Sequence, residues 1–206
     1  MEKDIPCKQR SKTSRVATLI TDKTDFKLKH IRRDKAGHFL LIKGTIQQED
    51  IIIVNIYAPN VGTPTFIKQS LWDIRSQIDP NTIILGDFNT PLTPLDRSSG
   101  QKMNKDCSDL KKTIDQMDLI DTYRLFQSAT PEYTFFSAGH GTFSKIHHIL
   151  GHKASTSKFQ RCDIIPCIFS DHNGMKLEIN NRKTKSNHIN TWRLNDTLLN
   201  EERIRK

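Results

Sequence analysis

Residues 82–91 read Thr82-Ile83-Ile84-Leu85-Gly86-Asp87-Phe88-Asn89-Thr90-Pro91. The apolar run at 82–85 ends in a glycine and a carboxylate, which is typical of a buried strand reaching its C-terminal edge. In an extended chain Asp87 and Asn89 point the same way and Phe88 points to the other face. Such a pair suits attack of water on phosphorus, because the acid takes a proton while the amide orients the water. The structural alternative is an Asp/Asn turn after a strand.

The sequence on both sides of this stretch predicts strands and two helices in mixed order. Apolar and β-branched residues predict strands at 16–20, 38–46, 51–57, 133–136, 144–150, 164–169 and 175–179. Residues 47–50 predict a hairpin turn. Thr63-Pro64 predicts a helix running to residue 78, with Thr63 as its cap, and a second helix is expected at 105–117. This order predicts an α/β sandwich with mixed sheets.

Length and composition describe one globular domain with a basic surface. The chain has 206 residues, of which 35% are hydrophobic, and Lys+Arg exceed Asp+Glu by 32 − 23 = 9. Such a surplus favours polyanionic partners, although a basic solvated surface without a partner has the same composition. The longest apolar run, residues 51–54, is too short to span a membrane. Four scattered cysteines and no export signal after Met1 predict reduced thiols and an intracellular protein.

Two further motifs end predicted strands with groups suited to a phosphate. Ser170-Asp171-His172 offers an imidazole that can donate to a phosphate oxygen and a carboxylate that can bind a hard cation. In Asn55-Ile56-Tyr57-Ala58-Pro59-Asn60, Tyr57 and Asn60 are neutral donors to phosphate. The alternatives are a polar loop for the first motif and a strand leaving through a proline turn for the second.

With the motifs in the order NIYAPN, GDFN and SDH, the chain resembles the endonuclease/exonuclease/phosphatase family, which includes apurinic/apyrimidinic endonucleases and deoxyribonuclease I. It is most similar to the endonuclease domain of mammalian long interspersed element (non-LTR) retrotransposons, in their second-open-reading-frame protein. Flanking stretches at 43–48, 133–138 and 144–146 add to this similarity. The resemblance implies a two-sheet α/β sandwich of the deoxyribonuclease-I-like type, Mg²⁺ as cofactor with Mn²⁺ as a substitute, and DNA as partner. It also implies nuclear action and a reverse transcriptase domain in the parent element.

The resemblance also assigns roles to single residues. Asp87 would be the general base, and Asn89 would position water and stabilise the transition state. Tyr57 would contact the scissile phosphate and His172 would hold its oxygen. The remaining assigned residues are Asn60, Arg97, Thr134 and Ser170 for phosphate or DNA contacts and Asp171 for assisting the metal.

Two departures from the family bear on activity. Relatives open with a strand–helix–strand unit that carries an asparagine and the main Mg²⁺ ligand, a glutamate. We expect this chain to begin after that unit, since Glu2 and Asp4 lie on no apolar strand. Relatives also have an aspartate at the position of His147, where a carboxylate fixes the tautomer of the active-site histidine. His147 is expected not to accept as a carboxylate does, and two adjacent cations would repel.

These observations predict a Mg²⁺-dependent DNA endonuclease of retrotransposon origin with impaired activity. A catalytically inactive DNA-binding module, or a retroelement fragment without function, stays open as the alternative. A zinc site built from His147, His148 and His152 is disfavoured, because adjacent strand residues face opposite sides. The expected organisation is a divergent segment at 1–15, the family domain at 16–180 and a basic polar tail at 181–206.

Overall fold

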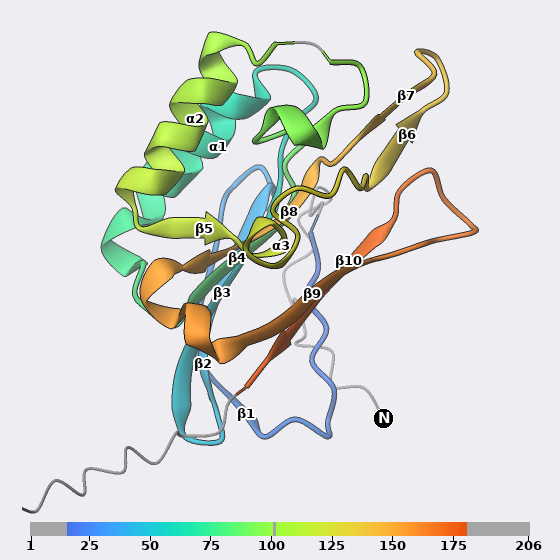
Figure 1. Cartoon of the computed structure of the whole chain (residues 1–206). Helices are drawn as coiled ribbons and strands as arrows, with labels where there is room; N and C mark the ends of the chain where they lie inside the picture. Colours follow the sequence, from blue (N-terminus) through green and yellow to red (C-terminus); the bar gives the residue numbers. More distant parts are fainter. Residues whose placement is uncertain (1–15, 101, 181–206) are drawn as a thin grey trace, which may run out of the picture.

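A computed structural model describes residues 16–100 and 102–180 of the chain. Its centre is a six-stranded sheet in the order β1-β2-β3-β4-β8-β5 (Figure 1). The strands are β1 (Phe26–Arg33), β2 (Phe39–Ile46), β3 (Glu49–Tyr57), β4 (Thr82–Asp87), β5 (Leu119–Asp121) and β8 (His147–His152). β3 and β4 pair in parallel, and the other pairs are antiparallel. Because parallel neighbours need a crossover, the chain passes through a helix between β3 and β4.

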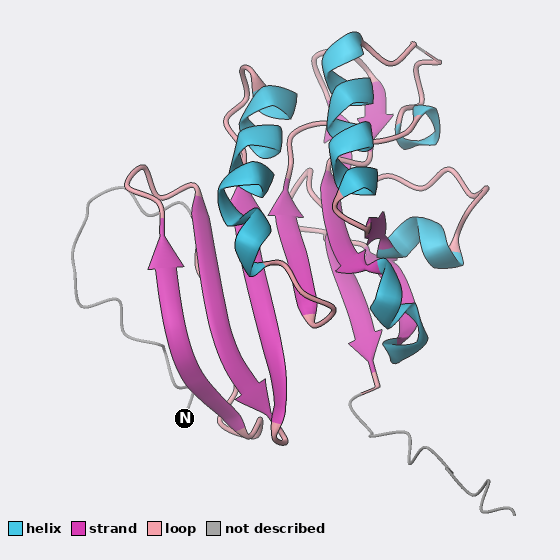
Figure 2. Cartoon of the chain, turned by 90° about the vertical axis from the view of Figure 1, so that its left-hand side faces the viewer, coloured by secondary structure: helices cyan, strands magenta, loops and turns pink. Residues whose placement is uncertain are grey.

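Helices cover one face of this sheet. The crossover helix is α1 (Thr63–Ile74), followed by the short 3-10 helix η1 (Arg75–Gln77), and α2 (Lys105–Gln116) packs beside α1. Figure 2 shows both long helices lying across the same face. The buried positions Ile67, Leu71 and Ile74 of α1 recur at helical spacing, so its apolar stripe faces the sheet. The shorter helical segments are α3 (Thr122–Phe126), η2 (Pro94–Asp96) and η3 (Lys153–Lys158).

The opposite face of the large sheet packs against the antiparallel pair β9 (Phe159–Ile165) and β10 (Gly174–Ile179). A separate hairpin, β6 (Phe135–Ser137) with β7 (Thr142–Ser144), projects from the body of the molecule (Figure 1). The large sheet has a hydrophobic core on each face, and side chains alternate between the two along β4. Ile84 packs toward the helices, while Ile83 and Leu85 pack toward β9 and β10. The predicted α/β sandwich with mixed sheets is therefore confirmed.

Most predicted elements are present, and four features differ from the prediction. Residues 16–20 form no strand, although Ile20 makes a single bridge, and β1 at Phe26–Arg33 was not predicted. The strand expected at 164–169 lies earlier, at Phe159–Ile165, and the following residues form an exposed loop. The helix cap is Gly62 rather than Thr63, whose hydroxyl donates instead to the Pro59 carbonyl at 2.6 Å.

The hairpin predicted at 47–50 is confirmed, but its turn is shorter. Ile46 pairs with Glu49, so Gln47 and Gln48 alone form the loop, with φ of 51° and 69°. Two-residue hairpin loops favour positive φ at both positions, because that backbone matches the twist of the strands. The expectations for residues 1–15 and 181–206 lie outside the described residues. Among 16–100 and 102–180, none of the helices has the length and apolar character needed to cross a membrane.

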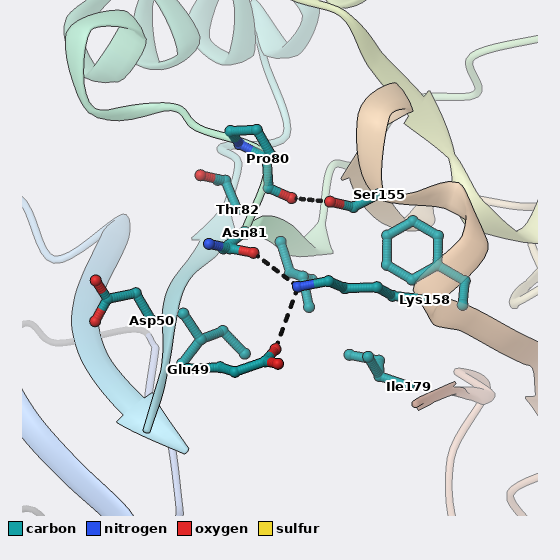
Figure 3. A pocket seen from close by; sticks show the side chains of 11 residues that line it. Glu49, Asp50, Pro80, Asn81, Thr82, Ser155, Lys158 and Ile179 are labelled. Carbon is teal, nitrogen blue, oxygen red and sulfur yellow. Dashed lines mark hydrogen bonds and ion pairs between the residues drawn. The ribbon is translucent and has the colours of Figure 1, made fainter. Parts of the chain in front are cut away.

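A small pocket lies between the start of β3 and the loop that carries η3 (Figure 3). The Lys158 ammonium reaches into it and donates to Glu49 at 3.3 Å and to Asn81 at 3.0 Å. Its volume of about 30 Å³ is enough for roughly one or two water molecules. Glu49 begins β3 and Tyr57 ends it, so this pocket lies at the opposite end of the sheet from the polar residues described next.

Candidate functional site

Strand register brings Tyr57, Asp87 and His147 together where their strands meet at one end of the large sheet. Tyr57 ends β3 and pairs with Asp87, which ends the parallel strand β4. Asp87 in turn pairs with His147, the first residue of the antiparallel strand β8. His172 approaches from the loop before β10, and its ring meets that of His147 with centroids 5.0 Å apart. Residues distant in the sequence therefore converge at one place.

Gly86 sets the position of Asp87. Its φ is +138°, and a Cβ atom at this residue would lie 2.0 Å from the Ile56 carbonyl oxygen, so only glycine fits. The backbone carbonyl of Asp87 accepts from the Ala58 amide at 2.9 Å, which ties the end of β4 to the chain after β3. In the Asp87 side chain, Oδ1 accepts from the backbone amide of Asn89 at 2.9 Å, and Oδ2 lies 3.9 Å from Nε2 of His147.

The backbone does not stay extended through Asn89, which corrects the simple alternation expected for this motif. Phe88 does turn into the helix-side core, where it is fully buried. Asn89 has φ of +47°, and its carboxamide donates to the Ala58 carbonyl at 2.8 Å. The side chain therefore fastens the two strand ends together, while its own carbonyl oxygen is left to interact with other groups.

His147 and His172 form a close imidazole pair. Nδ1 of His172 lies 3.1 Å from Nε2 of His147. Burial lowers the pKa of His147 to about 4; Asp87 opposes this effect and His172 adds to it. His147 is therefore neutral at neutral pH, and one of the two rings donates a hydrogen bond to the other. His172 keeps its Nε2–H free for another acceptor when Nε2–H of His147 is the donor and Nδ1 of His172 the acceptor. Unlike a carboxylate, neutral His147 brings no negative charge to His172. The expectation that His147 cannot accept as a carboxylate does stays a prediction.

The same residues form a group of metal-ligating side chains. Asp87, His147 and His172 each place one ligand atom within 4.8 Å of the other two. Mg²⁺ prefers oxygen ligands, and this group offers one carboxylate and two imidazoles, so it fits Mg²⁺ poorly. Asp171 is not part of the group; its side chain is 63% exposed and lies 4.0 Å from His172 Nε2. Its metal-assisting role stays a prediction.

The other predicted contact residues surround this edge in different ways. Thr134 is fully buried, and its hydroxyl accepts from the backbone amides of Ile146 and His147 at 3.0 and 3.2 Å. It therefore fixes the start of β8 and has no exposed surface to offer DNA. The Ser170 hydroxyl accepts from the His172 amide at 3.1 Å, which shapes the loop. Asn60 is exposed just after β3, and Arg97 is partly buried beside Ser144.

A buried charge network beneath the site was not predicted. The Lys145 ammonium, with no exposed surface, donates to Asp121 at 2.6 Å and lies 3.8 Å from Asp96. Asp96 also pairs with Arg124 at 2.5 Å. Nε2 of His148 lies 3.0 Å from the Thr90 carbonyl and its Nδ1 lies 3.0 Å from Asp121. His148 thus faces away from His147, as expected for strand neighbours. Nothing in the local sequence marks these charged residues as buried.

Comparison with known proteins places this arrangement in a family. The model of the Endonuclease/Exonuclease/phosphatase family matches residues 7–172. The chain is 29% identical over 161 residues to the Transposon TX1 uncharacterized 149 kDa protein of Xenopus laevis. That match covers 75% of this chain and 12% of the relative, so the chain spans only a small part of that protein's length.

Solved structures share the fold at low identity. The AP endonuclease from Archaeoglobus fulgidus aligns with a TM-score of 0.61 at 17% identity, covering 75% of this chain and 72% of that one. The endonuclease domain of TRAS1, a telomere-specific non-LTR retrotransposon, aligns with a TM-score of 0.63 at 14% identity, covering 80% and 73%. At these identities the likeness concerns the fold, and it confirms the predicted deoxyribonuclease-I-like class.

Proposed function

This chain belongs to the endonuclease/exonuclease/phosphatase family, and from that premise we propose that it is a DNA endonuclease domain of retrotransposon origin whose Mg²⁺-dependent nicking is impaired. The observation that carries the proposal is the convergence of Tyr57, Asp87 and His172 at one sheet edge. General-base, phosphate-donor and electrostatic groups meeting at one point are what hydrolysis of a phosphodiester requires.

Each side chain has a role that its environment supports. Asp87 Oδ2 takes the proton of the attacking water, because Oδ1 is already engaged by the Asn89 amide. The Asn89 carbonyl oxygen orients that water, since its NH₂ group donates to Ala58. His172 donates Nε2–H to a phosphate oxygen while Nδ1 faces His147, and Tyr57 contributes a neutral donor from the next strand.

Impairment follows from the charge that His147 does not supply. A carboxylate beside Nδ1 of His172 would stabilise the charged imidazolium that best holds a phosphate oxygen. His147 is a neutral ring at this position, so His172 lacks the negatively charged partner that would strengthen its hold on a phosphate oxygen. The described ligand set is also poor in oxygen for Mg²⁺, which would polarise the phosphate and neutralise developing charge when bound.

DNA as substrate is supported by the two solved structures with this fold, an AP endonuclease and a retrotransposon endonuclease domain, and by the formal net charge of +9. We also propose that it acts on nuclear DNA and that its parent element carries a reverse transcriptase domain. The loss of the carboxylate at residue 147 also favours a second candidate, a catalytically silent domain that binds DNA without cutting it.

A plasmid-nicking series separates these two functions. The full chain, His147→Asp and Asp87→Asn are incubated with supercoiled DNA and Mg²⁺. We expect His147→Asp to nick at least about tenfold faster than the unmodified chain, because the aspartate restores a negative charge beside His172. Asp87→Asn should remove the remaining activity. His30→Ala, at an exposed histidine on β1, is the matched control and should leave nicking unchanged.

Three results would contradict the proposal in whole or in part. Equal nicking by the unmodified chain and Asp87→Asn would assign the activity to a contaminant. No nicking by any variant, together with salt-dependent DNA retention, would support the silent DNA-binding domain. If His147→Asp nicked no faster than the unmodified chain, while Asp87→Asn nicked more slowly, residue 147 would not be the cause of the impairment.

A further inference from the structure

The ligand group at the sheet edge differs in chemistry from a magnesium site. We infer that Asp87, His147 and His172 form a site for a borderline transition-metal dication such as Zn²⁺, with Asp87 Oδ2 and one ring nitrogen of each histidine as ligands. Imidazole suits Zn²⁺, Ni²⁺, Co²⁺ and Cu²⁺, whereas Mg²⁺ takes oxygen. The histidine at residue 147 is what changes the preference, because it replaces a hard oxygen donor with a nitrogen.

The distances are close to what such an ion needs. A tetrahedral ion with bonds of about 2.0–2.1 Å holds its ligand atoms roughly 3.3 Å apart. Nδ1 of His172 and Nε2 of His147 are already 3.1 Å apart, and Asp87 Oδ2 lies 3.9 Å from Nε2 of His147. The ligand atoms of Asp87 and His172 lie within 4.8 Å of each other, so side-chain shifts of roughly 1–1.5 Å bring three atoms onto one ion.

The surroundings hold the three ligands in place and leave an ion access to water. Oδ1 of Asp87 is held by the Asn89 amide, which leaves Oδ2 directed at His147. The ring of His172 packs on that of Phe135 with centroids 4.7 Å apart. The side chains of Asp87, His147 and His172 are 14%, 19% and 36% exposed. Three protein ligands with solvent access leave a coordination position for water or a phosphate oxygen.

Binding of metal to the full chain, without DNA, tests the inference. Isothermal titration calorimetry with Zn²⁺ under reducing conditions should give one ion per chain. His147→Ala and Asp87→Asn should each weaken Zn²⁺ binding by roughly tenfold or more, since even loss of a supporting group costs about 10–100-fold. His30→Ala, an exposed histidine on β1, is the control and should bind as the unmodified chain does.

Cobalt(II) reports which atoms bind. Its visible absorption should show nitrogen and oxygen ligands, and that spectrum should change in His147→Asp, a variant that keeps a polar group and guards against misfolding of the alanine variant. Equal Zn²⁺ affinity in all variants, or a thiolate-to-cobalt charge-transfer band from the cysteines, would overturn the inference. Because no step uses DNA, this outcome is independent of whether the chain nicks plasmid.

Discussion

Gly86 is the residue on which the position of Asp87 depends most directly. Because an alanine Cβ there would lie 2.0 Å from the Ile56 carbonyl, and because φ is +138°, we expect Gly86→Ala to cost at least about 2 kcal/mol of unfolding free energy. Urea unfolding followed by circular dichroism measures this. Gly62→Ala is the matched control: φ is +70°, no atom lies within 4 Å, and the cost should be about 1 kcal/mol. Equal costs would show that steric conflict with β3 is not the reason for glycine at residue 86.

At the same scale, the sequence predicts where Asp87 and Phe88 lie but not where Asn89 points. A strand ending in glycine and aspartate is a local pattern, and the fully buried Phe88 follows from alternation. The φ of +47° at Asn89 depends instead on a hydrogen bond to Ala58, 31 residues away. The distance between His147 and His172 likewise depends on strand register and a loop, neither of which local patterns specify.

The β2–β3 hairpin has a turn whose residues are not the best ones for its backbone. Gln47 and Gln48 both have positive φ, which Asn-Gly adopts at lower cost, and both side chains are exposed. We expect the double change Gln47→Asn with Gln48→Gly to raise the free energy of unfolding by about 0.5–2 kcal/mol. The pair Gln47→Ala with Gln48→Ala is the control and should give no gain in urea unfolding. A gain from both pairs would place the effect outside the turn.

The buried network fastens several elements to one another through Lys145. Removing its positive charge leaves the buried Asp121 carboxylate without its lysine partner and the Asp96 carboxylate with Arg124 alone. Lys145→Met should therefore cost about 3–5 kcal/mol of unfolding free energy. Lys111→Met is the matched control, because Lys111 pairs with Asp115 at the surface of α2 and should contribute less than about 1 kcal/mol. Chemical denaturation of both variants checks this. A loss at Lys145 no larger than that at Lys111 would contradict a structural role for the network.

Which elements the sequence predicts depends on how each is buried. β3, β4 and α1 have buried faces with regular spacing, and their positions were predicted to within a few residues. β1 lies at the edge of the sheet and most of its side chains are exposed, so Phe26–Arg33 lacks the apolar alternation that marks a strand. Residues 16–20 are apolar enough to suggest a strand but pair only at Ile20.

For the whole molecule, composition and element order predicted a mixed α/β sandwich, and this class is confirmed. Strand order was not predicted, because β8 enters the large sheet between β4 and β5 through contacts distant in sequence. That insertion is what places His147 opposite Asp87. The site and the buried charges therefore both depend on tertiary topology, and both bear on how stability responds to pH.

Two sets of groups titrate abnormally, in different pH ranges. Burial raises the pKa of Asp96 and of Asp121, but Lys145 and His148 outweigh it at both, with Arg124 adding at Asp96, so both values are lowered. Carboxyls with lowered pKa stabilise the fold above their ordinary pKa of about 4, and this stabilisation disappears as the pH falls further. Burial lowers the pKa of His147 from 6.5 to about 4, so the unfolded chain binds the proton first and stability falls as pH decreases across that interval.

We therefore expect the free energy of unfolding to fall in two steps as pH decreases, a shallow one between about 6.5 and 4 and a steeper one below about 4. Urea midpoints measured from pH 7.5 to pH 3 in the presence of chelator, which removes bound metal, would resolve them. His147→Asn should abolish the first step alone, because asparagine does not titrate. Asp121→Asn should lower stability at neutral pH and flatten the second step, whereas Asp50→Asn, at an exposed ion pair with Lys29, should change neither. A single step that both His147→Asn and Asp121→Asn leave intact would mean that neither the imidazole pair nor the buried network determines the acid stability of this fold.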